Sequence, residues 1–445
     1  MESTQNKPHV VVLASPGMGH VTPLLELAKR LVVDHGFHVT FLSITTDAPP
    51  AQLQLLSNPS IPSDLHVVSL PNVDVSQQAN NVSVRIVLMI QETLKSLTFV
   101  LKNLQSPIKI FVFDPFCTIA HDVAADLSIL TYLFLTSSAS FLALAMFFPT
   151  INAVVNGDHS KIAKEILVPD CKPLFLDDLI PGVLMPELLL MSNILPIVNG
   201  VLVNTWEELE PVTLHSIRES PFFLGLPTPP VYPIGPLTKE SELVTSTLES
   251  LKLMKWLDQQ PACSVVYVTF GSEWTLSGKQ MSELALGLEL SQKRFVWVAR
   301  PPNEASVSGN FFKASFNEDD PASYLPKGFL DRTRGRGLVT SSWAPQVAVL
   351  SHQFSVLHGV VMIAWPLYAE QMMNARFLVD AGVAVWPEAE EDDGKRVVGR
   401  CEVERVVRTI LDKEEGEGLR RRVRELQGTA MKALEVGGPS NGSLV

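Results

Sequence analysis

The sequence predicts an α/β protein of two domains, each built on a doubly wound parallel sheet. The chain has 445 residues, which is long for a single core and favours two domains. Short apolar runs rich in Val, Ile and Phe alternate with longer helical patterns from the first residues onward. A proline-dense segment interrupts this alternation near the middle of the chain, and the alternation then restarts.

The first half opens with a strand, a helix and a second strand, which is the pattern of a βαβ unit. The apolar run at 9–14 is followed by a helical pattern at about 21–33 and a second apolar run at 38–43. Further strands are predicted at 66–70, 108–113, 131–135 and 201–204, with helices at 82–104 and 117–127. Strands separated by helices in this way form a parallel sheet covered on both faces.

Residues 127–157 carry no charged side chain and are long enough to suggest a membrane span. Against a span, the polar run 136–140 interrupts the middle of this stretch, and Pro149 and Asn152 follow. We therefore expect a buried strand followed by a core helix.

The segment 226–236 contains five prolines and leads into the polar run 238–250. Proline removes a backbone donor and restricts φ, so this segment forms neither a central strand nor a helix. The pattern resumes with strands at 264–270, 295–299, 337–340, 361–365 and 383–386 and a helix at 277–290. We predict an N-terminal domain over 1–237, a linker over 238–255 and a C-terminal domain over 256–445.

The charge, the cysteine content and the N-terminal sequence argue against binding to nucleic acid, anionic lipid or metal and against secretion. The chain has 35 basic and 47 acidic residues, a net charge of −12 that opposes binding to nucleic acid or anionic lipid. The four cysteines are scattered without metal-ligand spacing, which favours free thiols in a reducing compartment. The N-terminus lacks the charged and apolar regions of a secretory signal. We expect a cytoplasmic protein without a bound metal.

The first predicted strand ends in Ser-Pro-Gly-Met-Gly-His at 15–20, a glycine-containing turn into a helix, where open α/β sheets place ligands. The third glycine and the acidic residue of a dinucleotide fingerprint are missing, which argues against nicotinamide binding. His20 is a candidate general base, or simply a polar residue at a helix start. Asp114 follows another apolar strand and would orient the imidazole, or only cap a helix before Pro115.

The second half carries two tryptophans at predicted strand ends. Each is either a buried core residue or offers its indole face for stacking against a flat ring of a ligand. Trp343 begins the run WAPQ, and Trp365 begins the run WPLYAEQ. Glu370 and Gln371 close the second run at a predicted helix start, where they offer acceptors and donors to sugar hydroxyls.

These residues resemble the plant UDP-dependent glycosyltransferases of secondary metabolism, and within them the subgroup that glucosylates hydroquinone and other small phenols. The resemblance covers nearly the whole chain. It rests on SPGMGH at 15–20, VFD at 112–114, VNTWEELEP at 203–211, PPVYPIGPL at 229–237, WLDQQP at 256–261, VVYVTFGS at 265–272, LALGLELS at 284–291, LPKGF at 325–329, WAPQVAVLSH at 343–352 and HGVVMIAWPLYAEQ at 358–371.

The resemblance implies two Rossmann-like domains of the GT-B type, with the acceptor in the first, the UDP-sugar in the second, and a monomeric chain. It implies that His20 removes the acceptor hydroxyl proton, that Asp114 supports His20, and that UDP leaves in one inverting step without a metal or cofactor other than the co-substrate UDP-glucose. By position, Trp343 would stack on uracil, Ala344 and Gln346 would contact the nucleoside, and Glu370 and Gln371 would hold glucose. Ser138 and Ser272 would lie near the sugar and the diphosphate.

The chain departs from the family in its donor box. Between His352 and Gly359 the family has about fifteen more residues, which contain an H-C-G-W-N-S run and a glutamate that bind the diphosphate and the ribose. Glu273 and Trp274 replace a usual glycine pair, and the chain ends at Val445, before the family's helix that returns to the first domain. The second domain is therefore expected to be incomplete. Two hypotheses follow: a weakened or inactive glucosyltransferase, and a non-catalytic derivative that binds a small aromatic molecule.

Overall fold

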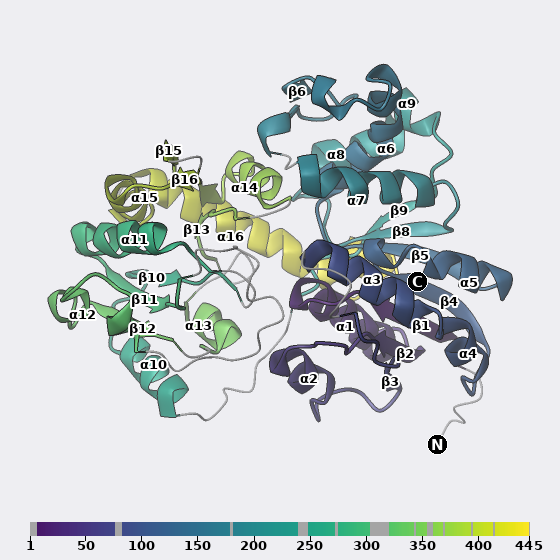
Figure 1. Ribbon diagram of the computed structural model, residues 1–445, viewed down its shortest axis with the longest axis horizontal. Coiled ribbons are helices and arrows are strands. Elements are labelled where there is room, and N and C mark those ends of the chain that lie inside the picture. Colours follow the sequence, from purple (N-terminus) through teal and green to yellow (C-terminus); the bar gives the residue numbers. More distant parts are fainter. Residues whose placement is uncertain are drawn as a thin grey trace. The chain divides into compact units, whose positions relative to one another are not determined.

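The computed structural model describes residues 7–75, 82–178, 181–238, 248–271, 275–302, 320–341, 344–353, 359–367, 370–392, 395–412 and 414–444. The chain divides into two compact units (Figure 1). Unit 1 comprises Met1–Lys239 together with Ala430–Val445, and unit 2 comprises Glu240–Thr429. Each unit is described below by itself.

Unit 1 is built on a parallel sheet in the order β3-β2-β1-β4-β5-β8-β9. The strands are β1 (His9–Ala14), β2 (His38–Ser43), β3 (Leu65–Ser69), β4 (Ile108–Phe113), β5 (Leu130–Leu135), β8 (Gly200–Val203) and β9 (Val231–Pro233). β1 lies between two neighbours, and all six of its residues are at most 2% exposed. A strand covered on both faces needs apolar side chains on both, which explains why it reads as a continuous apolar run. β9 forms inside the proline-dense segment because it is the edge strand.

Helices connect these strands and cover the sheet (Figure 1). They are α1 (Met18–Val33), α2 (Pro50–Leu56), α3 (Val82–Leu94), α4 (Leu97–Lys102), α5 (Ala120–Asp126), α6 (Ala139–Val154), α7 (Pro181–Ile194), α8 (Pro211–Glu219) and α9 (Pro221–Leu224). The helix predicted over 82–104 is two helices, α3 and α4. They are separated where the Ser96 hydroxyl donates to the Thr93 carbonyl at 2.8 Å, a local bond that competes with the helical pattern.

The uncharged stretch 127–157 forms β5 and α6, as expected for a buried strand and a core helix. Phe141, Leu142 and Leu144 of α6 are fully buried. In the described part of the chain, no helix is both long and apolar enough to cross a membrane.

Three histidines lie together on β1, β2 and β3 of unit 1. The ring centroids of His9 and His38 are 4.6 Å apart, and those of His38 and His66 are 5.0 Å apart. Burial lowers the pKa of His9, although its bond to the Ser106 carbonyl opposes this. Burial, followed by repulsion from His9 and His66, lowers the pKa of His38.

We expect this cluster to make the protein less stable in mild acid. Histidines in the unfolded chain have a pKa of about 6.5. Above that pH the cluster is neutral in both states, so the folded state keeps its full stability. It is lost as pH falls through the lower pKa values of the folded state, because the unfolded chain then binds more protons. The melting temperature should fall between pH 7 and pH 5, measured by circular dichroism. His38→Gln should flatten this dependence by a few degrees, whereas His215→Gln, on the exposed face of α8, should not. Identical pH profiles for His38→Gln and the parent would contradict the prediction.

The strands of unit 2 form separate sheets. β10 (Val265–Val268), β11 (Arg294–Val298) and β12 (Gly337–Thr340) make one parallel sheet, and β13 (Met362–Ile363) and β14 (Ala384–Val385) make another. β15 (Glu390–Asp392) and β16 (Lys395–Val397) form an antiparallel pair. The helices are α10 (Leu248–Asp258), α11 (Gly278–Ser291), α12 (Phe329–Arg332), α13 (Gln346–Gln353), α14 (Gln371–Asp380), α15 (Arg400–Asp412) and α16 (Glu414–Leu434), which extends into unit 1.

Two boundaries differ from the prediction. Residues 248–255, assigned to the linker, begin α10, because Leu253 and Leu257 pack at helical spacing against Val296. The prediction also placed everything after residue 256 in the second domain. Residues 430–445 instead belong to unit 1, where α17 (Pro439–Gly442) ends beside Leu444, which packs on the core of that unit. The chain therefore does contain a segment that returns to the first domain.

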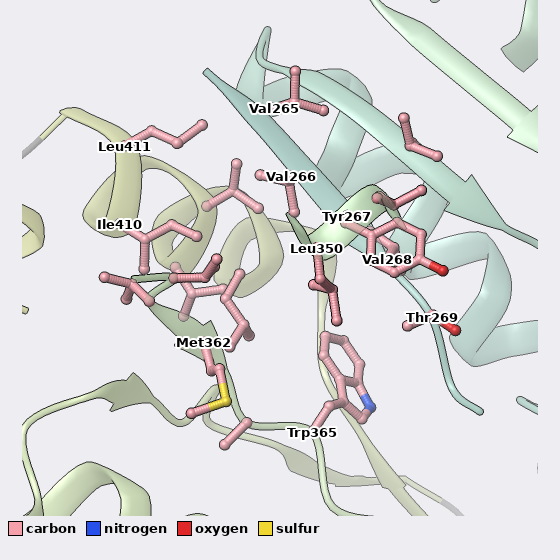
Figure 2. A pocket seen from close by; sticks show the side chains of 18 of the residues that line it. Val265, Val266, Tyr267, Val268, Thr269, Leu350, Met362, Trp365, Ile410 and Leu411 are labelled. Carbon is pink, nitrogen blue, oxygen red and sulfur yellow. The ribbon is translucent and has the colours of Figure 1, made fainter. Parts of the chain in front are cut away.

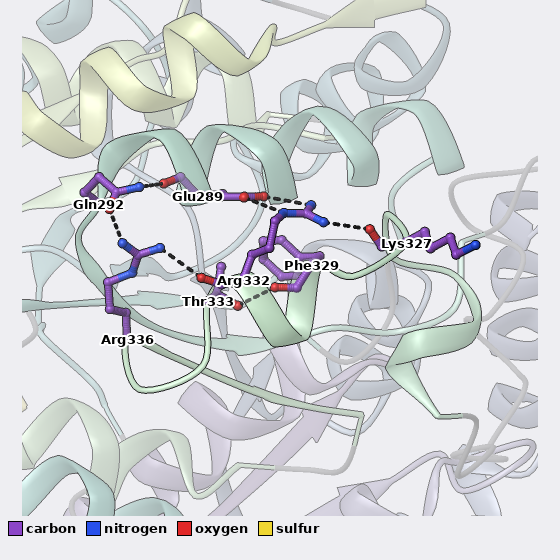
Figure 3. A network of polar contacts seen from close by, with 7 residues as sticks. All are labelled: Glu289, Gln292, Lys327, Phe329, Arg332, Thr333 and Arg336. Atoms are coloured by element: carbon purple, nitrogen blue, oxygen red, sulfur yellow. Dashed lines mark hydrogen bonds and ion pairs between the residues drawn. The ribbon is translucent and has the colours of Figure 1, made fainter.

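A polar network joins α11 to α12 and to the turn before β12 (Figure 3). The Arg332 guanidinium bonds both carboxylate oxygens of Glu289, at 2.6 and 3.0 Å, and also donates to the Lys327 carbonyl at 2.8 Å. The bidentate bond lowers the pKa of Glu289. Arg336 donates to the side chain of Gln292, the C-cap residue that follows α11. Because the network is exposed, it orients these elements more than it stabilises them.

Candidate active site

The candidate active site of unit 1 lies at the carboxyl ends of β1 and β4. These strands are parallel neighbours, with Leu13 opposite Phe113. The strand order reverses between them, because β2 and β3 lie on one side and β5, β8 and β9 on the other. Ligands of open α/β sheets bind at such a switch point. His20 follows β1 and Asp114 follows β4, so both predicted residues belong to this point.

A sharp turn after β1 places His20 in the first turn of α1. Gly17 has φ 112° and ψ 139°, a conformation that residues with a Cβ rarely adopt. The His20 backbone N–H donates to the Gly17 carbonyl at 3.1 Å, so the helix starts immediately. The first glycine of the 15–20 motif is thus required by the backbone. Gly19 has φ in the ordinary range, and a Cβ there would contact nothing within 4 Å.

His20 and Asp114 form a hydrogen-bonded pair. The distance from His20 Nδ1 to Asp114 Oδ2 is 2.5 Å; the His20 side chain is 26% exposed and that of Asp114 is fully buried. A carboxylate accepts only, so Nδ1 carries the proton and Nε2 is the nitrogen that can accept one. The Phe116 ring packs edge to face against the imidazole, with the two ring centroids 5.3 Å apart. This arrangement provides an oriented base whose protonated form the buried carboxylate would stabilise.

The other oxygen of Asp114 caps the short 3-10 helix Pro115–Cys117. Its Oδ1 accepts from the Phe116 backbone N–H at 2.9 Å. Asp114 therefore makes both contacts that the sequence suggested, the bond to His20 through Oδ2 and the helix cap through Oδ1. The Cys117 thiol is fully buried there, and burial, with repulsion from Asp114, raises its pKa far above the ordinary value. It is not a candidate nucleophile.

Ser138 caps α6 at the carboxyl end of β5. Its Oγ accepts from the Phe141 backbone N–H at 3.2 Å. Sequence reasoning assigned no role to Glu210, which also holds this helix start: its carboxylate accepts from the backbone N–H groups of Ala139 and Ser140 at 2.8 and 3.0 Å. Glu210 is 3% exposed, and burial raises its pKa. No local pattern reveals this contact, because about seventy residues separate the partners.

The predicted donor-binding residues of unit 2 that the structure describes lie after strand ends. Ala344 follows β12 and is 5% exposed among apolar neighbours. Gln346 is the first residue of α13. Glu370 precedes α14, and Gln371 begins it. The Gln371 Oε1 accepts from the Leu367 backbone N–H at 2.9 Å, which ties the side chain to the loop after β13.

Ser272 and Trp343 lie outside the described residues, as do Glu273 and Trp274. Trp365 is described, and its ring meets Phe270 edge to face at 5.9 Å within unit 2. All four cysteines are free thiols, as predicted. Among the residues that the structure describes, no three His, Cys, Asp or Glu side chains gather as metal ligands would.

Solved structures define the class of protein to which this fold belongs. The chain superposes on TcCGT1 in complex with UDP with a TM-score of 0.89, at 38% identity over 99% of this chain and 98% of that one. It superposes on Phytolacca americana UGT2, complexed with UDP-2-fluoro-glucose and pterostilbene, with a TM-score of 0.84, at 34% identity over 98% of each chain. The fold is therefore that of the two-domain GT-B glycosyltransferases.

Curated relatives narrow this class to a family. UDP-glycosyltransferase 72E1 of Arabidopsis thaliana is 38% identical over 97% of this chain and 93% of that protein. The hydroquinone glucosyltransferase of Rauvolfia serpentina is 36% identical over 99% of this chain and 97% of that protein. No family model matches the chain. The chain belongs to the plant UDP-dependent glycosyltransferases, as the sequence motifs predicted.

Proposed function

We propose that this chain is built to transfer glucose from UDP-glucose to a hydroxyl of a small phenol, with inversion, and that its shortened donor box weakens this activity. The observation that carries the proposal is the 2.5 Å bond between His20 Nδ1 and Asp114 Oδ2 at the switch point of unit 1. The hydroquinone glucosyltransferase among the relatives and the pterostilbene bound to UGT2 support a phenolic acceptor.

In the proposed reaction, His20 Nε2 accepts the proton of the acceptor hydroxyl. The acceptor oxygen forms a bond to the anomeric carbon of glucose while the bond from that carbon to the diphosphate oxygen breaks, and UDP leaves with the electron pair. Asp114 holds the imidazole and stabilises the imidazolium. The step needs no metal, and UDP-glucose is the co-substrate.

On the donor side, Trp343 stacks on uracil, and Ala344 and Gln346 contact the nucleoside. Glu370 and Gln371 bind the glucose hydroxyls, and Gln371 favours glucose over its epimers. Ser138 and Ser272 lie near the sugar and the diphosphate. The start of a helix after a parallel strand suits these roles, because backbone N–H groups there favour anionic ligands.

The length of the alignment with a relative is consistent with a shortened donor box. The alignment with the Arabidopsis relative runs over 460 positions, more than the 445 residues of this chain, so some positions of that relative have no counterpart here. The strands of unit 2 that flank the expected gap belong to different sheets. This division supports the second candidate function, a derivative that binds a small aromatic molecule without turnover.

Calorimetric titration of the purified chain with UDP-glucose, and separately with hydroquinone, distinguishes the two functions. We expect UDP-glucose to bind within the range of enzyme substrates, about 1 μM to 1 mM, and a small amount of glucosylated hydroquinone to form. UDP-galactose, as the control donor, should bind more weakly. Hydroquinone binding without any binding of UDP-glucose would establish the non-catalytic derivative, and binding of neither would contradict both proposals.

A further inference from the structure

A buried carboxylate occupies the N-terminus of α6 in unit 1. Glu210 is 3% exposed, and its two oxygens accept from the backbone N–H groups of Ala139 and Ser140 at 2.8 and 3.0 Å. The Ser140 hydroxyl donates to the same carboxylate at 3.1 Å. Ser138 Oγ accepts from the third N–H group, that of Phe141, at 3.2 Å. The first three N–H groups of the helix therefore all have partners within the protein.

The fold brings Glu210 to this helix start from the neighbouring strand. β5 and β8 are parallel neighbours, so the segments that follow them leave the sheet at the same edge. Glu210 lies after β8 and directly precedes α8, which packs against α6 (Figure 1). The Thr213 hydroxyl, in the first turn of α8, bonds that of Ser140 at 3.2 Å. The starts of the two helices are thus joined through one buried carboxylate.

The bonding pattern favours an ionised Glu210. Both of its oxygens accept hydrogen bonds, and a helix N-terminus stabilises negative charge. Burial raises the pKa of the carboxyl, while the bonds from Ala139 and Ser140 oppose that shift. Among the described residues, no Lys or Arg forms an ion pair with it. At neutral pH the group is therefore a buried negative charge that backbone and hydroxyl dipoles compensate.

This helix start lies one strand away from the candidate active site. β5 is the parallel neighbour of β4, and Asp114 follows β4. Asp114 is a second buried carboxylate, and its partner His20 would gain a positive charge only on taking the acceptor's proton. The edge of the sheet therefore presents two buried carboxylates behind neighbouring strands. Such an edge favours a neutral ligand over an anion.

We propose that Glu210 is a specificity-determining residue: it fills the N-terminus of α6, so that this edge of unit 1 takes uncharged acceptors and rejects those that carry a carboxylate or a phosphate. In open α/β sheets such a helix start commonly binds an anionic ligand. Here the chain supplies the anion itself. The helix starts that attract the diphosphate are then those of unit 2. The inference rests on the phenolic acceptor of the proposed function and not on the transfer of glucose.

Calorimetric titration with two matched phenols tests the proposal. 4-Hydroxybenzamide and 4-hydroxybenzoate share their ring and phenol hydroxyl and differ by one charge at neutral pH. The unaltered chain should bind the amide about tenfold more tightly at low ionic strength. In Glu210→Gln this ratio should fall to about threefold, because Asp114 alone then repels the anion. Glu208→Gln removes an exposed charge two positions away and should keep the full ratio.

A second variant separates charge from shape. Glu210→Asp keeps the negative charge on a shorter side chain, so it should keep the preference for the amide even where it loosens the start of α6. If Glu210→Gln does not fold, this variant and the unaltered chain decide.

Four results would overturn the proposal. They are equal binding of the two phenols by the unaltered chain, an unchanged ratio in Glu210→Gln, loss of the preference in Glu210→Asp, and an equal fall in Glu208→Gln. Binding of neither phenol would contradict the phenolic acceptor of the proposed function, and this inference with it. Binding of the amide without turnover would contradict the transfer alone and leave the role of Glu210 supported.

Discussion

Insertion of the family's missing segment between His352 and Gly359 should raise the rate of glucosyl transfer by several orders of magnitude. The loss of one preorganised donor to developing charge costs about 10²–10³ in rate. The family's segment supplies several contacts to the diphosphate at a helix N-terminus, and these would all return together. The measurement is the turnover of UDP-glucose and hydroquinone by the purified 445-residue chain and by the extended chain.

The insertion should also stabilise unit 2. A cavity of about 420 Å³ in unit 2 is lined by β10 and β13 (Figure 2). The strand of the inserted segment would enter this cavity and cover apolar side chains such as Val266 and Met362. The extended chain should therefore melt at a higher temperature than the parent. In a matched control, the histidine, asparagine and serine of the inserted H-C-G-W-N-S run are replaced by alanine. This control should keep the gain in stability and lose most of the gain in rate. Equal rates for the parent and the extended chain would refute our account of the donor box.

His20→Ala should abolish glucosylation, in the extended chain as well as in the parent. A general base contributes a factor of about 10²–10⁴ to the rate. Among the described residues of unit 1, His20 is the only basic side chain that bonds Asp114. The fold should survive, because the side chain lies partly exposed in the first turn of α1. The initial rate and the circular dichroism spectrum test both statements. His215→Ala, on the exposed face of α8, is the control and should keep full activity.

Asp114→Asn should also lose most activity, although Asp114 acts through His20 and not on the substrate. An asparagine oxygen can still accept from the Phe116 N–H, so the cap survives while the imidazole loses its carboxylate. The pH dependence of kcat/KM should shift in this variant, which the loss of a merely structural residue would not cause. Retained turnover in His20→Ala, or an unchanged pH profile in Asp114→Asn, would refute the assigned roles.

The sequence alone determined six of the seven strands of the large sheet of unit 1 and the residues that follow them. The bounds of β1, β2 and β4 agree with the apolar runs at 9–14, 38–43 and 108–113. Buried parallel strands show this clearly, because they are apolar on both faces and end abruptly in polar turns. β13 and β14 are shorter than the predicted runs at 361–365 and 383–386. The motifs were specific enough to establish the family, because they are spread over nearly the whole chain.

Only the tertiary structure decided which of these residues meet. His20 and Asp114 are 94 positions apart, and they bond because β1 and β4 are neighbours, which follows from the strand order and from no local pattern. The same holds for Glu210 at the start of α6 and for the return of residues 430–445 to unit 1. The cavity lined by β10 and β13 also became visible only once both strands had their places, because a cavity is a property of the packed side chains and not of any single residue.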